Sequence, residues 1–99
     1  MNKLDSVYYE AVTVATECGA VSDEALKTLH ETARKFALID EPGEAARYYE
    51  RVFTLWRNAR RDELSGGVKT RFADALAEYI ELLRKLERHE RALTVFEAM

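Results

Sequence analysis

The chain contains few residues that interrupt helices, since four glycines and one proline are spread over 99 positions. Loop-rich and β-rich folds need more of both, so this scarcity disfavours them. A single cysteine excludes an internal disulfide and a cysteine-based zinc site. No apolar run approaches the roughly 20 residues of a membrane span, and the first residues lack the basic-then-apolar order of a secretion signal. We therefore expect a cytoplasmic protein in a reducing compartment, with no membrane partner.

The charge is mildly acidic, with a formal net charge of −3 although 33% of the residues are charged. A protein with a domain-wide nucleic-acid surface would normally be basic, so we expect no nucleic-acid partner. One segment does carry five arginines, and a solvated helix face with local acidic partners explains them better than a nucleic-acid site. These arginines are Arg47, Arg51, Arg57, Arg60 and Arg61.

Apolar residues recur at steps of three and four in five segments, which is the spacing of amphipathic helices. The five stripes span residues 4–18, 25–37, 45–59, 72–86 and 92–99. Gly19 suits a left-handed cap at the end of the first helix, and Ser22 suits the N-cap of the second. No segment alternates with a period of two, so no sheet is expected. The sequence predicts an all-α fold of about five helices.

An internal repeat is the strongest signal in the sequence. A shift of 47 residues superposes the second and third predicted helices on the fourth and fifth. The matched pairs are Leu29 with Leu76, Phe36 with Leu83, Asp40 with Glu87, Ala45 with Ala92, and Tyr49 with Phe96. A small alanine lets the two helices of a pair approach closely, and the aromatic residue one turn later fills the gap beside it.

This pattern resembles the tetratricopeptide repeat family, in the long-period variety found in kinesin light chains. The first repeat matches the family's steps at every position, and the second matches except at Ile80, where a small residue is usual. The residues are Leu29, Ala33, Phe36, Ala45 and Tyr49, then Leu76, Ile80, Leu83, Ala92 and Phe96. The resemblance implies one domain over 1–99, an antiparallel helix-turn-helix superhelix. It divides the chain into a partial repeat over 1–21, with a second-type helix, and two repeats over 22–66 and 67–99.

The chain also departs from the family's pattern. Asp40 and Glu87 stand where the usual turn glycine would be, and no proline closes either repeat. The step of 47 residues also exceeds the family's usual length of about 34. A five-helix bundle without repeat stacking therefore remains an alternative architecture.

The resemblance implies a peptide-binding concave face lined by the first helix of each repeat. It places eight residues there, namely Lys27, His30, Arg34, Leu38, Asp74, Glu78, Glu81 and Arg84. Helical spacing by itself shows that each set of four shares one helix face. We therefore expect a non-catalytic module that binds a protein or peptide partner, with no cofactor and no metal.

Two alternatives compete with this interpretation. The first is a structural homo-oligomer in which helical faces bind only one another. Val95, Phe96 and Met99 form an apolar stripe in the last helix, and a second copy is the simplest cover for it. We expect a two-fold homodimer with Phe96 or Trp56 near the contact.

The second alternative is a small enzyme or metal protein that uses His30, Glu78 and Glu81. The sequence offers no histidine pair at a spacing of four and no Glu-x-x-His motif in its favour. We therefore expect no catalysis.

Overall fold

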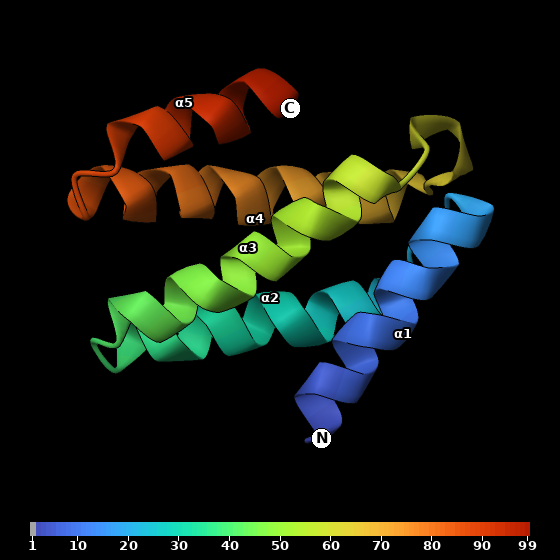
Figure 1. Cartoon of the computed structure of the whole chain (residues 1–99), viewed down its shortest axis with the longest axis horizontal. Coiled ribbons are helices and arrows are strands. Elements are labelled where there is room, and N and C mark those ends of the chain that lie inside the picture. The colour runs from blue at the N-terminus through green and yellow to red at the C-terminus, as the bar shows by residue number, and fades with distance from the viewer. Residues whose placement is uncertain (1) are drawn as a thin grey trace.

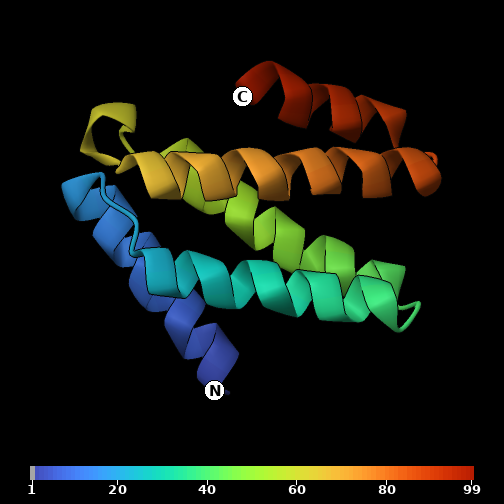
Figure 2. The ribbon, with the colours of Figure 1, turned by 180° about the vertical axis from the view of Figure 1, so that it is seen from behind.

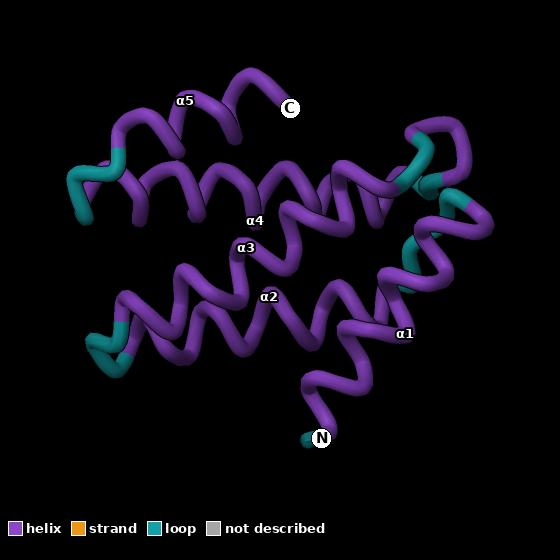
Figure 3. The backbone as a smooth tube through the Cα atoms, viewed as in Figure 1, coloured by secondary structure: helices purple, strands orange, loops and turns teal. Residues whose placement is uncertain are grey.

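The computed structural model describes residues 2–99, and helices account for 84% of the chain. The helices are α1 (Lys3–Cys18), α2 (Asp23–Leu38), α3 (Pro42–Asn58), α4 (Gly66–Lys85) and α5 (His89–Ala98), with a short 3-10 turn η1 (Arg61–Glu63). No strand occurs in this described part (Figure 3). The predicted all-α fold of five helices is confirmed.

Local capping sets most of the helix ends. Gly19 ends α1 with a φ of 76°, and Ser22 begins α2 by accepting a hydrogen bond from the amide of Ala25 at 3.3 Å. Both caps agree with the sequence prediction. Helix α4 begins at Gly66, six residues ahead of the apolar stripe, because the Ser65 hydroxyl accepts a hydrogen bond from the amide of Val68 at 3.2 Å. Gly66 and Gly67, which precede the predicted stripe, therefore lie in the first turn of the helix.

The turn after α2 and the turn after α4 have the same backbone geometry. Asp40 and Glu87 both have a φ of 60°, in the left-handed region that favours glycine. In both turns the next amide donates to the carbonyl five positions earlier, at 2.8 Å. Because the two turns are 47 residues apart, the repeat found in the sequence is present in the backbone.

Consecutive helices run antiparallel and form successive layers (Figure 1). Helices α2 and α3 form one hairpin, α4 and α5 form the next, and α4 packs against both α2 and α3. Helix α1 contacts both α2 and α3, and its N-terminal end diverges from α2 (Figures 1 and 2). Helix α5 lies at the edge of the molecule opposite to α2 in both views. The two opposite edges of the molecule are therefore formed by different helices, α2 at one and α5 at the other.

The core confirms the close-approach alanines but not every aromatic position. Ala45 and Ala92 are buried as predicted, and so is Tyr49. Phe96, the residue aligned with Tyr49, is instead 66% exposed, and its neighbour Val95 takes the buried position. The reason is that Tyr49 packs beneath α4, whereas no helix within residues 2–99 follows α5. The expectation that Phe96, like Tyr49, fills the gap beside the alanine one turn earlier is therefore wrong.

Candidate functional site

The structure separates the eight predicted partner-binding residues into two groups on α2 and α4. Six are exposed, and these are Lys27, Arg34, Leu38, Asp74, Glu81 and Arg84. The exposed Arg34 and the buried His30, both on α2, contact Glu78 on α4 across the α2–α4 interface. The predicted face is thus partly occupied by contacts within the chain.

Glu78 accepts hydrogen bonds from the side chains of His30, Arg34 and Tyr49, and we call these four residues the Glu78 cluster. Arg34 Nη2 donates to Oε2 at 2.6 Å, and Tyr49 Oη donates to Oε1 at 2.8 Å. His30 Nε2 lies 3.0 Å from Oε1. The cluster joins α2, α3 and α4 through a single carboxylate.

The electrostatics of the cluster follow from these bonds. Burial alone would raise the pKa of Glu78, but the hydrogen bonds from Arg34, His30 and Tyr49 outweigh it and lower the pKa to about 2. Burial, followed by the bond to Glu78, raises the pKa of Tyr49. Glu78 is therefore ionised at neutral pH, which places the proton of the His30 contact on Nε2. His30 is only 1% exposed, so the prediction that it lies open to a peptide is wrong.

A second polar cluster also pairs a tyrosine with a glutamate across α3 and α4, but here the tyrosine lies on α4 and the glutamate on α3. Tyr79 on α4 donates to Glu50 on α3, and Arg91 on α5 pairs with the same carboxylate. Burial and this bond raise the pKa of Tyr79. The rings of Tyr49 and Tyr79 stack at 5.8 Å between the two clusters. Each tyrosine thus bonds to a glutamate of the other helix, which fixes the register of α3 against α4.

The arginine-rich segment has partners within the chain. Arg51 donates to Asp5 at 2.7 Å, and its guanidinium lies 4.6 Å from the centre of the Tyr8 ring. Arg60 donates to the carbonyl of Cys18 at 3.0 Å. Within the described residues, only Arg47, which pairs with Glu44 at 3.5 Å, has the local acidic partner that was predicted, because Arg51 is 11% exposed and its partner lies on another helix.

Trp56, the second residue expected near a dimer contact, also has partners within the chain. Its indole Nε1 donates to the carbonyl of Ala98 at 2.8 Å, and its ring packs 5.1 Å from that of Phe72. The Arg61 guanidinium lies over the other side, 3.5 Å from the ring centre. Trp56 therefore fastens the end of α5 to the end of α3, which leaves Phe96 as the exposed member of the predicted pair.

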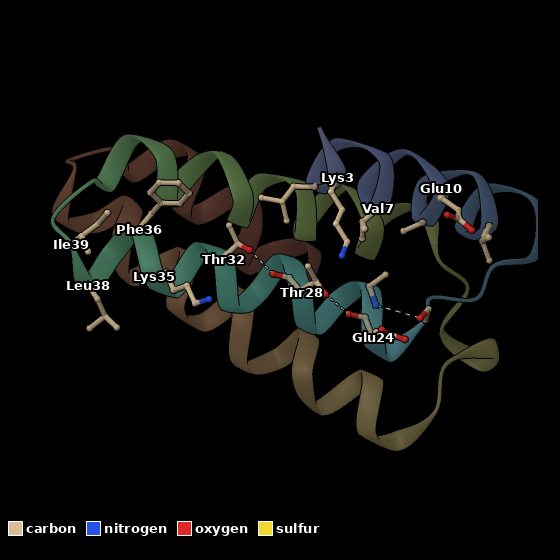
Figure 4. Close-up of a pocket in the computed structure, with 15 residues that line it drawn as sticks. Lys3, Val7, Glu10, Glu24, Thr28, Thr32, Lys35, Phe36, Leu38 and Ile39 are labelled. Atoms are coloured by element: carbon tan, nitrogen blue, oxygen red, sulfur yellow. Dashed lines mark hydrogen bonds between the residues drawn. The ribbon is translucent and has the colours of Figure 1, made fainter. Parts of the chain in front are cut away.

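A groove of about 990 Å³ lies between α1 and α2 (Figure 4). We call it the α1–α2 groove. Its lining is mainly apolar and comes from both helices and from the residue that follows α2. The apolar residues are Leu4, Val7, Ala11 and Val14 on one side, and Ala25, Phe36, Leu38 and Ile39 on the other.

The charged residues of the groove are sorted along its length. Glu10 and Glu24 lie toward one end, Lys3 projects toward α2 near the middle beside Glu24, and Lys35 lies further toward the other end (Figure 4). The hydroxyl of Thr28, between Glu24 and Lys35, donates to the carbonyl of Glu24 at 2.9 Å. The groove is therefore an apolar channel with two glutamates toward one end and a single lysine, Lys35, toward the other.

The groove was not predicted as a site, and Leu38 alone belongs both to it and to the predicted set. A signal was present, because the stripe of α1 includes Val7 and an exposed Val14 one heptad later. That spacing indicates an apolar face but does not say which helix covers it.

The polar clusters show no arrangement that binds a metal. Within residues 2–99, no three or more histidine, cysteine, aspartate or glutamate side chains lie together as a metal ion would require. His30 and Glu78 are in contact, whereas Glu81 pairs with Arg84 at 3.2 Å. None of the described helices is both long and apolar enough to cross a membrane.

Comparison of the chain with protein-family models, with curated proteins and with solved structures finds no match.

Proposed function

We propose that this protein is a non-catalytic interaction module that binds an amphipathic helix of a partner protein in the α1–α2 groove. The observation that carries the proposal is the groove itself, an apolar channel of about 990 Å³ between two helices. A helix of ten residues is about 15 Å long and about 10 Å wide, which corresponds to roughly 1,200 Å³. The groove therefore has room for most of the width of one such helix.

A helix suits this groove better than an extended peptide does. Strand addition requires an open sheet edge, and the described residues contain no sheet. Two helices that diverge from each other instead provide the hydrophobic channel used in helix-in-groove recognition. The tetratricopeptide-like arrangement that we infer adds a second reason. In that arrangement, a first-type helix would precede α1 and contact both α1 and α2, which is where the groove lies.

The charges of the groove favour one direction for the bound helix. The N-terminus of a helix carries a partial positive charge and its C-terminus a partial negative charge. We therefore expect the N-terminus near Glu10 and Glu24, and the C-terminus near Lys35. A helix in this direction runs parallel to α2 and antiparallel to α1. The repeat pattern, which does not depend on charge, requires the same direction for a first-type helix.

A labelled peptide of defined design tests this proposal. The probe is a 14-residue amphipathic helix with leucine and phenylalanine on one face, lysines in its first half and glutamates in its second. Fluorescence anisotropy should give a Kd in the range of about 1–100 µM, as expected of a small apolar contact. A peptide with the two charged halves exchanged should bind more weakly, and one with scrambled apolar positions should not bind.

A pair of variants locates the binding site on the chain. Val7→Asn places an unpaired amide in the groove and should weaken peptide binding about tenfold. Thr16→Asn also introduces an asparagine into α1, but at an exposed position outside the groove, and it should leave the affinity for the peptide unchanged. Equal binding of the designed and scrambled peptides, or equal losses in the two variants, would overturn the proposed function.

A further inference from the structure

We propose that the helix that occupies the α1–α2 groove is α5 of a second copy of this chain, bound head to tail. This inference rests on the proposed function, because it identifies the partner for that same groove. It is based on the distribution of exposed apolar side chains, the length and stripe of α5, and the charges at its two ends.

Nearly all the exposed large apolar residues belong to one of two surfaces. Val14, Leu38 and Ile39 line the groove, and Leu38 is 86% exposed. Leu93, Phe96 and Met99 lie on α5 or at its end. Tyr9 is the single exposed large apolar residue of the described chain outside both surfaces. Since exposed apolar patches of this kind mark interaction sites, the two surfaces are candidates to cover each other.

The exposed stripe of α5 has the form that the groove requires. Leu93, Phe96 and Met99 follow one another at steps of three, so they form one line along the helix. The buried Ala92 and Val95 lie on the adjoining face of α5 and pack on α4, whereas Leu93, Phe96 and Met99 are 57%, 66% and 49% exposed. Helix α5 can therefore present its stripe to another molecule without leaving its own place in the fold. It has ten residues, so its volume of roughly 1,200 Å³ is close to that of the groove.

The ends of α5 match the ends of the groove in the direction inferred above. Glu97, four residues after Leu93, lies beside the stripe at the C-terminal end, where it would meet Lys35. The N-terminal end has an exposed Arg88, which has no side-chain cap bond to the first turn in this structure, and it would meet Glu10 and Glu24. The acidic Glu90 of the first turn opposes this match, whereas Arg88 and the positive end of the helix favour it.

The location of the two surfaces favours a head-to-tail contact over a two-fold dimer. They lie at opposite edges of the molecule, α1 and α2 at one and α5 at the other (Figures 1 and 2). A two-fold contact pairs one surface with itself and leaves the other exposed, whereas a head-to-tail contact covers one of each. Such a contact repeats from copy to copy and forms a ring or an open chain. This proposal replaces the two-fold arrangement expected from the sequence and keeps Phe96 at the contact.

A complementation experiment on the full chain tests the proposal. Phe96→Glu disables the α5 surface and leaves the groove intact, whereas Val7→Glu disables the groove and leaves α5 intact. In sedimentation velocity, the wild-type mass should rise with concentration beyond twice the 11.4 kDa of one chain. Each variant alone should stay at 11.4 kDa or associate at least tenfold more weakly. An equimolar mixture should form a species of twice that mass that grows no further, because one working surface of each kind remains.

Two further variants keep the test decisive. Tyr9→Glu changes the exposed apolar residue outside both surfaces and should assemble as the wild type does. Ile39→Glu, at a 65% exposed position of the groove, replaces Val7→Glu if circular dichroism shows that the latter is unfolded. A wild type that stays monomeric up to about 1 mM, or a mixture that stays monomeric, would overturn the head-to-tail proposal. If that monomer still bound the designed peptide, the proposed function would stand without the head-to-tail contact. If the chain neither self-associated nor bound the peptide, both proposals would be overturned.

Discussion

Replacing Glu78 by glutamine removes the charge from the carboxylate that joins three helices. The pKa of about 2, against 4.5 for a free glutamate, corresponds to about 3 kcal/mol in favour of the ionised form. The side chain is 31% exposed, and solvent screening at such a position reduces the effect to about 2 kcal/mol. We expect Glu78→Gln to lower the free energy of unfolding by that amount at pH 7. The melting temperature should fall by roughly 8–16 °C, given the size of the chain.

The pH dependence shows whether the stability lost in Glu78→Gln is electrostatic or comes from altered packing. A carboxyl with a lowered pKa in the folded state stabilises the fold fully above the pKa of the unfolded chain, and this contribution is lost as the pH falls toward 2. The difference between wild type and Glu78→Gln in urea denaturation should therefore shrink between about pH 5 and pH 2.

Glu81→Gln is the matched control, because Glu81 lies one turn further along α4. It is 64% exposed and pairs only with Arg84, so the substitution should change the stability by less than about 0.5 kcal/mol. A loss of stability in Glu78→Gln that does not vary with pH, or one no larger than that of the control, would refute the reasoning.

Three further experiments test the fold. Ala45→Leu should overpack the crossing of α2 and α3 and cost roughly 1–3 kcal/mol in chemical denaturation. Ala92→Leu should cost less, since α5 packs mainly against α4 alone; unchanged stability in both would contradict the repeat register. Asp40→Gly and Glu87→Gly should each raise the stability by about 0.5–1 kcal/mol, because glycine removes the cost of a φ of 60°. A lower melting temperature in either would show that the acidic side chain makes a compensating contact. The raised pKa of Tyr49 predicts stability that is complete below pH 10 and falls as the pH rises above it, because the unfolded chain loses its proton first. Urea denaturation at pH 9 and pH 11 measures this fall, which should be smaller in Tyr49→Phe.

The features that the sequence predicted correctly depend on near neighbours along the chain. Gly19, Ser22 and the two turns at Asp40 and Glu87 are each determined by a few consecutive residues and their backbone conformations. The start of α4 was misplaced because Ser65 caps the two glycines that follow it, and the cap outweighs their low helix propensity.

The features that the sequence did not predict depend on which helix lies next to which. His30 and Glu78 are 48 residues apart, and their contact exists because α2 and α4 pack against each other. Spacing placed both residues on exposed helix faces and gave no sign that those faces meet. For Phe96 and the α1–α2 groove the error has the opposite sign. An apolar stripe indicates a buried face, but no helix of the described chain covers these two stripes.

Because Trp56 bonds to the end of α5, the tryptophan fluorescence of this protein reports whether α5 is docked on the rest of the fold. Trp56 is the only tryptophan in the chain, so the emission comes from one indole, held between Phe72 and Arg61 and bonded to the carbonyl of Ala98. If α5 detaches from the body, that indole becomes exposed to water and its emission shifts to longer wavelength, while α1 to α4 retain their helical signal. The same helix is the one that we propose to join neighbouring copies. Emission and circular dichroism recorded on one unlabelled sample therefore separate the opening of α5 from the unfolding of the rest.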